Sequence, residues 1–208
     1  MEALRFNYDN WKLWENVVIV SMDTGHFEDV MRGCHRLLDI QRKFEDVEVL
    51  RLLVRAIVQD NKDADGNSAA RLRKRALELF GRITSVHQNN PEIWQLYSDL
   101  SPTYLLKAQR LQKAYKGYTQ SGSWPNNPET CKKVMELVQL LLEYSLKARK
   151  DAEEKDHLQA NQQLSSARLT GQAVIRAAEK QDWPETKEML EELKTLFNDV
   201  TEYMKSVL

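Results

Sequence analysis

The sequence predicts an all-α protein, built from antiparallel helix pairs that stack in chain order and end in a segment of three long helices. Two observations support this prediction. Apolar residues recur at three- and four-residue steps along most of the chain, whereas the period-two alternation of half-buried strands is absent. Glycine and proline are scarce, with 7 and 5 residues among 208, and the prolines stand at the edges of the periodic segments. A chain of this length can bury a sizeable core.

The first helix pair follows the spacing of a known helical repeat. The first helix carries Trp14, Val17, Val18 and Ser21, the turn Gly25 and Phe27, and the second helix Val30 and Cys34. The tetratricopeptide unit has this order, with a period of 34 residues. One pair cannot bury its apolar face alone, so we expect an α-solenoid of tetratricopeptide-like pairs in a right-handed superhelix.

Ala3-Leu4 occupies the slot that Leu37-Leu38 fills one period later. This register predicts that the chain opens inside the last helix of a preceding repeat. We therefore expect it to be the C-terminal piece of a longer helical-repeat protein.

Apolar stripes and turn residues place the helices of the repeat region. We expect helices over 10–24, 27–42, 46–59, 68–86, from Pro91 onward, and over 104–118. Gly25 ends the first of these, because glycine readily adopts the positive φ of a helix end. The polar run 60–67 predicts an exposed loop. Asn90-Pro91 predicts an N-cap followed by proline at the first helical position.

The segment 119–127 contains Ser-Gly-Ser-Trp-Pro-Asn-Asn and predicts a linker. It divides the chain into a repeat region, 1–124, and a C-terminal helical bundle or cap, 125–208. Asn127-Pro128 repeats the capping pattern and opens the first of three long helices. The second, over about 157–180, is rich in small residues, which implies close approach of a neighbouring helix.

The net charge of −1 hides an uneven distribution. Residues 66–124 carry +6, between flanks of −4 and −3. A basic middle can attract an acidic partner or pair within the fold. The two cysteines, Cys34 and Cys131, fit no disulfide or zinc framework and indicate a reducing compartment. No apolar run reaches membrane-spanning length, so we expect no membrane partner.

The sequence lacks the usual signatures of catalysis. The four histidines form no metal-binding spacing, and the glycine-rich phosphate-binding and nucleophile motifs are absent. Adjacent carboxylates such as Glu153-Glu154 stand on polar helix faces. We therefore expect a protein that is not an enzyme and has no cofactor and no metal.

Basic residues on two predicted helices could form one surface, here called the basic strip. Its members are Arg71, Lys74, Arg75, Arg82, Lys107, Arg110 and Lys113. With Glu78 between them, the members on the first helix fall at three- and four-residue steps and share a face. Those on the later helix repeat every three residues and drift slowly round it. The strip could bind an acidic segment of a protein or the phosphates of RNA, or it could be a solvated surface facing the acidic flanks. No ribonucleoprotein-type aromatic motif favours RNA.

The tryptophans divide into two groups. Trp14 and Trp94 occupy the repeat's tryptophan position and should fill the space between paired helices. Trp11 and Trp124 are less fixed by the pattern and could be exposed anchors on a groove.

Several strings in residues 1–124 resemble the C-terminal region of the tetratricopeptide repeat protein 27 family. They are Trp11-Lys-Leu-Trp-Glu-Asn16, Leu52-Leu-Val-Arg-Ala56, Leu79-Phe-Gly-Arg-Ile-Thr-Ser85, Glu92-Ile-Trp-Gln-Leu-Tyr97 and Lys113-Ala-Tyr-Lys-Gly-Tyr-Thr-Gln-Ser121. The resemblance implies a non-enzymatic adaptor in the cytoplasm, with the nucleus as a second compartment. It also implies a link to chaperone-assisted assembly of large complexes such as spliceosomal particles, and in fungi to cell-wall integrity.

Some tetratricopeptide domains grip the acidic C-terminus of heat-shock chaperones with a lysine and an asparagine on the first helix of a repeat. In this chain those positions hold Glu15 and Ile19, so such a carboxylate clamp is not supported here. The leading hypothesis is a scaffold for protein–protein interaction that holds an extended or acidic segment. The alternatives are an RNA-binding half-tetratricopeptide repeat protein and a purely structural cap.

Overall fold

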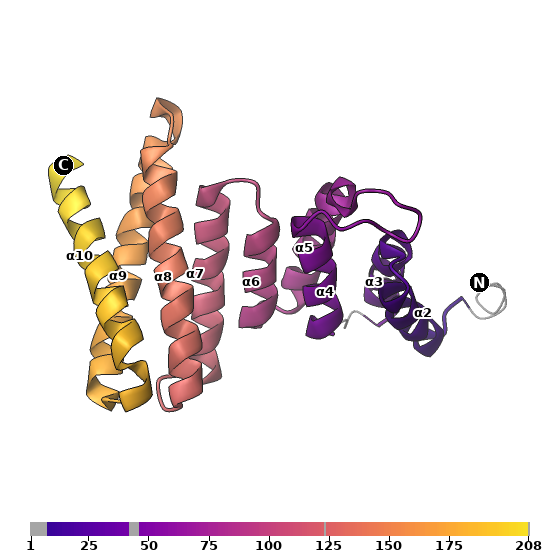
Figure 1. The fold of residues 1–208 in the computed structure, drawn as a ribbon, viewed down its shortest axis with the longest axis horizontal. Helices are drawn as coiled ribbons and strands as arrows, with labels where there is room; N and C mark the ends of the chain where they lie inside the picture. The colour runs from indigo at the N-terminus through magenta and orange to yellow at the C-terminus, as the bar shows by residue number, and fades with distance from the viewer. Residues whose placement is uncertain (1–7, 42–45, 123, 208) are drawn as a thin grey trace. The chain divides into compact units, whose positions relative to one another are not determined.

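A computed structural model describes residues 8–41, 46–122 and 124–207 (Figure 1). Within these ranges the chain forms nine α-helices, three short 3-10 turns and no β-strand, with an isolated bridge between Lys62 and Ser68. The residues group into two compact units, Met1–Gln88 and Asn89–Leu208. The all-α prediction is confirmed. The expectation for Ala3-Leu4 lies outside the described residues.

The first unit consists of four helices. Its helices are α2 (Trp11–Asp23), α3 (Phe27–Gln41), α4 (Val47–Val58) and α5 (Arg73–Val86), and a 3-10 turn at Ala69–Leu72 leads into α5. Helix α2 packs on α3 and on α4, and α3 packs on α5. Helices α2 and α3 thus pack as a pair, and each also packs on the helix two places further along the chain, as in stacked repeats. The largest fully buried side chains are Met31, Leu50, Leu53, Ile57, Leu79, Phe80 and Ile83.

Side-chain caps begin two of these helices. The Asn10 carboxamide oxygen accepts a hydrogen bond from the Lys12 N–H at 3.1 Å, and the Asp46 carboxylate accepts one from the Val49 N–H at 3.0 Å. Each cap satisfies a backbone donor that has no partner within the helix. The starts of α2 and α4 therefore follow from local sequence.

The turn between α2 and α3 has the predicted chemistry. Gly25 adopts φ +76°, and Phe27 and Val30 behind it are buried. A Cβ atom on Gly33 would lie 2.4 Å from Cγ2 of Val18. The two helices therefore approach closely where glycine on α3 faces valine on α2.

The second unit consists of five helices. They are α6 (Pro91–Leu100), α7 (Tyr104–Ser121), α8 (Pro128–Lys150), α9 (His157–Gln181) and α10 (Lys187–Val207). Each packs on the next along the chain, and α7 also packs on α9 and α8 on α10. Figure 1 shows the same order. The stacking predicted from the repeat spacing thus holds within both units, and the tetratricopeptide-like fold class is confirmed.

The capping predictions for this unit are confirmed. The Asn90 carboxamide oxygen accepts from the N–H groups of Glu92 and Ile93, and that of Asn127 accepts from the N–H groups of the second and third residues of α8. The close approach predicted for the small residues of α9 occurs at Gly171. A Cβ atom there would lie 3.2 Å from the Phe197 side chain.

The predicted linker 119–127 is too long at its start. Helix α7 continues to Ser121, because Tyr118 is buried and extends its apolar stripe, and Gly122 then adopts φ +69°. The predicted boundary between 124 and 125 falls inside the second unit, where α7 packs on α8. The division into 1–124 and 125–208 stays a prediction.

The helix pair α6–α7 depends on a glycine. A Cβ atom on Gly117 would lie 2.7 Å from the Asn89 carbonyl oxygen and 3.2 Å from the Pro91 nitrogen. Both contacts are to main chain, so no rotamer change can relieve them. Glycine at 117 therefore permits α7 to reach the start of α6.

We expect Gly117→Ala to lower the free energy of unfolding by about 2 kcal/mol, the cost of overpacking a tight contact. At an unconstrained helix position the same change stabilises by up to about 1 kcal/mol, so the sign of the effect tests the contact. Urea denaturation followed by far-UV circular dichroism measures it. Gly171→Ala is the control with a smaller expected loss, because its contacts are to side chains that can move. A Gly117→Ala protein as stable as wild type would contradict this account.

Candidate protein-interaction surface

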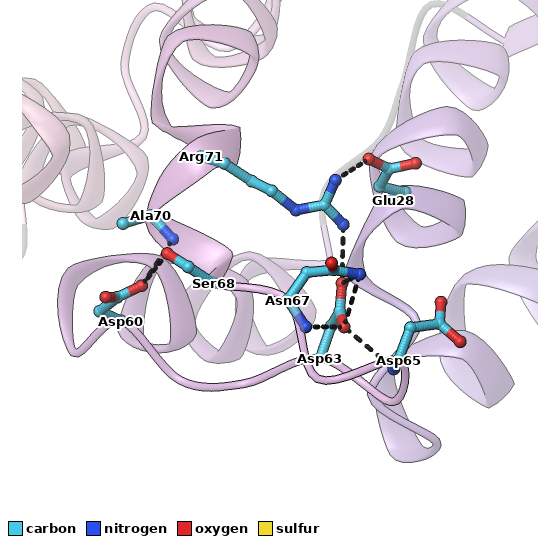
Figure 2. A network of polar contacts seen from close by, with 8 residues as sticks. All are labelled: Glu28, Asp60, Asp63, Asp65, Asn67, Ser68, Ala70 and Arg71. Carbon is cyan, nitrogen blue, oxygen red and sulfur yellow. Dashed lines mark hydrogen bonds and ion pairs between the residues drawn. The ribbon is translucent and has the colours of Figure 1, made fainter.

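Arg71, the first member of the basic strip, forms ion pairs within the first unit (Figure 2). Its guanidinium donates to Glu28 on α3, with Nη1···Oε1 of 2.6 Å, and to Asp63 in the loop before α5, with Nη2···Oδ2 of 2.7 Å. The Asp63 side chain is only 6% exposed, so water screens this ion pair weakly. Arg71 thus joins the loop to α3, and two carboxylates of the fold compensate its charge.

Asp63 organises the loop around its carboxylate. It accepts hydrogen bonds from the N–H of Asp65 at 3.0 Å and of Asn67 at 2.7 Å, and from the Asn67 side-chain amide at 3.3 Å. Burial by itself raises the pKa of Asp63, but the hydrogen bonds from Arg71, Asn67 and Asp65 outweigh it and lower the pKa to about 2. The loop predicted only as exposed is therefore an ordered hydrogen-bonded structure.

Asp60 holds the other part of this loop. Its carboxylate accepts hydrogen bonds from the Ser68 hydroxyl and, at 3.1 Å, from the Ala70 N–H (Figure 2). These two bonds lower the pKa of Asp60, that of Ser68 having the larger effect. The chain is thus anchored immediately before the 3-10 turn that leads into α5.

The basic residues of α5 differ in their surroundings. Arg82 donates to Asp39 and, through Nη1, to Nδ1 of His35 at 3.0 Å. A guanidinium can only donate, so Nδ1 of His35 accepts this bond. Burial, and then the charges of Arg82 and Arg75, lower the pKa of His35. Lys74 and Arg75 are exposed and form no ion pair with any residue that the structure describes.

Arg110 on α7 is also a structural residue. Its guanidinium carbon lies 3.4 Å from the centroid of the Tyr97 ring, and it donates to the Tyr97 carbonyl at 3.0 Å and to the Ser101 hydroxyl. The side chain is half-buried, and burial lowers its pKa. Arg110 therefore joins the end of α6 to α7.

The remaining strip residues on α7 are two lysines. Lys107 Nζ lies 5.2 Å from the ring centroid of Tyr144 and 5.8 Å from that of Tyr104. Lys113 is exposed and forms no ion pair within the described part of the chain. The α5 and α7 members of the strip belong to different compact units, so their union into one surface stays a prediction.

The tryptophans separate core residues from one candidate anchor. Trp14 is buried, and its Nε1 donates to the Tyr8 carbonyl at 2.8 Å. Trp94 is partly buried and packs against the core of the second unit. Trp11 is 37% exposed and stays a candidate anchor. Trp124 is only 9% exposed, so its prediction as an exposed anchor is wrong, because the segment after α7 folds back onto the core.

Helix α2 presents Glu15 and Ile19 at the positions of the carboxylate clamp. Both side chains are exposed. A carboxylate repels an anionic ligand, and an isoleucine side chain offers no donor. The chemistry of this face therefore agrees with the absence of a clamp from the sequence.

The described residues show no metal centre or membrane-spanning element. Within 8–41, 46–122 and 124–207, no three His, Cys, Asp or Glu side chains are placed to hold a metal ion. No helix in these ranges combines the length and the apolar character needed to cross a bilayer. Cys34 and Cys131 are buried free thiols, and burial raises the pKa of both.

The second unit contains a cleft that the sequence analysis missed. It has a volume of about 500 Å³ and lies between the first turn of α7, the last turn of α8 and the first turn of α9. Helices α8 and α9 have 23 and 25 residues against 18 in α7, and they extend beyond the start of α7 in Figure 1. The unequal lengths of the predicted helices were the signal that could have indicated a recess here.

Asp63→Asn should destabilise the protein at pH 7 and reduce the pH dependence of its stability. Because the pKa of Asp63 is lowered from 3.8 to about 2, its charge stabilises the fold above about pH 4 and loses this effect as the pH falls toward 2. The melting temperatures of wild type and variant should therefore converge on acidification. Asp65→Asn is the matched control, because the structure shows only its N–H, and not its carboxylate, in this network. A constant difference between wild type and Asp63→Asn from pH 7 to pH 3 would contradict the assignment.

Comparison with known proteins finds similarity to tetratricopeptide-repeat proteins. No family model and no solved structure matches it. The tetratricopeptide repeat protein 27 homolog of Dictyostelium discoideum is 29% identical over 136 residues, which cover 64% of this chain and 16% of that protein. Protein trd-1 of Caenorhabditis elegans, which contains such repeats, is 26% identical over 170 residues, which cover 72% of this chain and 22% of that protein. A tetratricopeptide-repeat-containing protein of Schizosaccharomyces pombe is 29% identical over 133 residues, which cover 60% of this chain and 15% of that protein.

The chain thus spans less than a quarter of the length of these relatives. The relatives are repeat proteins by name, which agrees with the packing of helices seen within both units. The predicted relationship is confirmed: the chain is similar to proteins of the tetratricopeptide repeat protein 27 family.

Proposed function

We propose that this chain is a non-catalytic scaffold that binds other proteins. The observation that carries the proposal is that each helix packs on helices one or two places along the chain in both units, which builds extended surfaces from many turns of helix. The similarity to tetratricopeptide-repeat proteins supports the same function.

The partner that fits best is an extended protein segment with acidic residues. Lys74, Arg75 and Lys113 are exposed and have no ion pair among the described residues, so they can interact with carboxylates at little desolvation cost. The resemblance to the tetratricopeptide repeat protein 27 family suggests a setting. We place the scaffold in the assembly of large complexes such as spliceosomal particles, assisted by chaperones, in the cytoplasm and also the nucleus.

A pulldown tests this proposal. The 208-residue chain on beads is exposed to cytoplasmic and nuclear lysate, with and without RNase, and retained proteins are identified by mass spectrometry. We expect a small set of proteins whose recovery RNase leaves unchanged. Loss of the whole set after RNase would overturn the protein-scaffold proposal in favour of RNA binding. Recovery of the same proteins on beads carrying an unrelated helical protein would show non-specific capture and overturn both the protein-scaffold proposal and the RNA-binding alternative.

Charge reversal at Lys74, Arg75 and Lys113 should weaken recovery of these partners at least threefold without lowering the melting temperature. The three side chains are exposed and form no ion pair with any described residue. Arg71→Glu is unsuitable for this test, because it would break the contacts with Glu28 and Asp63.

The matched control reverses three exposed cations outside the strip, Arg176→Glu and Lys180→Glu on α9 and Lys205→Glu on α10, so it changes the net charge by the same amount. Equal loss of recovery in both proteins would show that net charge, and not the strip, governs binding. Unchanged recovery in the triple variant would remove the strip from the proposed function.

A further inference from the structure

The cleft at the start of α7 combines apolar walls with two carboxylates. Leu105, Ala148, Ala152 and Ala160 contribute small or aliphatic surface, and Asp151 and Asp156 line the same recess. A concave site with an apolar lining and a few convergent polar groups is the usual form of a recognition pocket. What distinguishes this cleft is that neither carboxylate has a counter-ion among the described residues.

Asp151 is placed where a negative charge is unfavourable. It is the C-cap residue of α8, next to the carbonyl end of a 23-residue helix, where the helix dipole favours cations. The nearby lysines of α8 do not neutralise it. Lys147 Nζ lies 5.4 Å from the ring centroid of Tyr104, and Lys150 Nζ lies 5.4 Å from that of Tyr203. Asp151 forms no ion pair with any described residue.

Asp156 is available as well. It occupies the N-cap position of α9, but its side chain makes no capping hydrogen bond. The one ion pair of the turn between α8 and α9 joins Lys155 to Glu153 within the described residues. Two carboxylates without a counter-ion therefore face one recess.

One cation also lines the cleft, so its position matters. Lys107 lies over the rings of Tyr104 and Tyr144, at 5.8 and 5.2 Å from their centroids, and forms no ion pair with either aspartate. Aromatic faces attract a cation, so Lys107 is held at the tyrosines. Among the residues that line the cleft, acidic charge exceeds basic charge.

We infer that this cleft is a docking site for a basic side chain, arginine or lysine, of a partner protein. The ammonium or guanidinium group would pair with Asp151 and Asp156 and complement the carbonyl end of α8. The aliphatic stem would lie against Leu105 and the three alanines, as the stems of these side chains do on apolar surfaces. The inference rests on the proposed function, because it names the chemistry of one contact that the scaffold makes. The scaffold would then recognise a basic side chain at the cleft in addition to the acidic segment expected at the basic strip.

An NMR titration tests the inference directly. N-acetyl-argininamide is added to the ¹⁵N-labelled 208-residue chain, and N-acetyl-citrullinamide, which has the same shape without the charge, is added in parallel. We expect saturable shifts at the amides around Ala152 and Leu105 with argininamide, with a dissociation constant on the order of millimolar for one exposed charged contact. Citrullinamide should bind at least about fivefold more weakly.

Two double variants complete the experiment. Asp151→Asn with Asp156→Asn should weaken argininamide binding at least about fivefold. Glu136→Gln with Glu143→Gln removes the same charge from the exposed face of α8 outside the cleft and should leave the affinity unchanged. The amide spectra of both variants establish that they are folded. Equal affinity of wild type and the aspartate variant, equal binding of citrullinamide, or absence of saturable shifts would each overturn the inference.

The pulldown separates this failure from failure of the proposed function. RNase-resistant partners together with no binding at the cleft would overturn the inference alone. Specific argininamide binding together with no protein partner would overturn the scaffold and leave only a cation-binding cleft.

Discussion

Burial of each helix's apolar stripe against helices one or two places along the chain is the interaction on which the rest of the structure depends. A single pair leaves one apolar face in water, so α2 needs α4 as well as α3, and α8 needs α10 as well as α9. Close approach makes this burial complete. Gly33 lets α3 reach Val18, and Gly117 lets α7 reach the main chain at the start of α6. Where these helices meet, the core tolerates little added volume.

Polar contacts fix the connections between these helices. Arg71 ties a loop to α3, Arg82 ties α5 to α3, and Arg110 ties α7 to the end of α6. Each arginine offers several donors in a planar group, which suits it to join two or three acceptors. Part of the positive charge in the basic region of the sequence is therefore used inside the fold and is not available to partners.

The packing of the helices also determines which residues remain available to bind partners. Lysines and arginines on the outer faces of α5 and α7, such as Lys74 and Lys113, keep their charges in water. The cleft arises because α8 and α9 are longer than α7, so their connecting turn stands beyond the end of that helix. The greater length of α8 and α9 thus brings Asp151 and Asp156 to one recess. Under our two proposals, exposed cations such as Lys74 and Lys113 and the two aspartates of the cleft would let the scaffold select partner segments by their charge as well as by their shape.

The sequence by itself determined the helices, their caps at Asn90 and Asn127, the glycine turn at Gly25 and the burial of Trp14, because each depends on residues within a few positions along the chain. Only the tertiary structure decided which surface residues are available. Arg71 lies 43 residues from Glu28 in the chain, and Trp124 is buried by helices on both sides of it. The cleft likewise depends on three helix ends meeting. Periodicity records which side of a helix is apolar, but ion pairs and recesses depend on which residues distant in sequence meet when the helices pack.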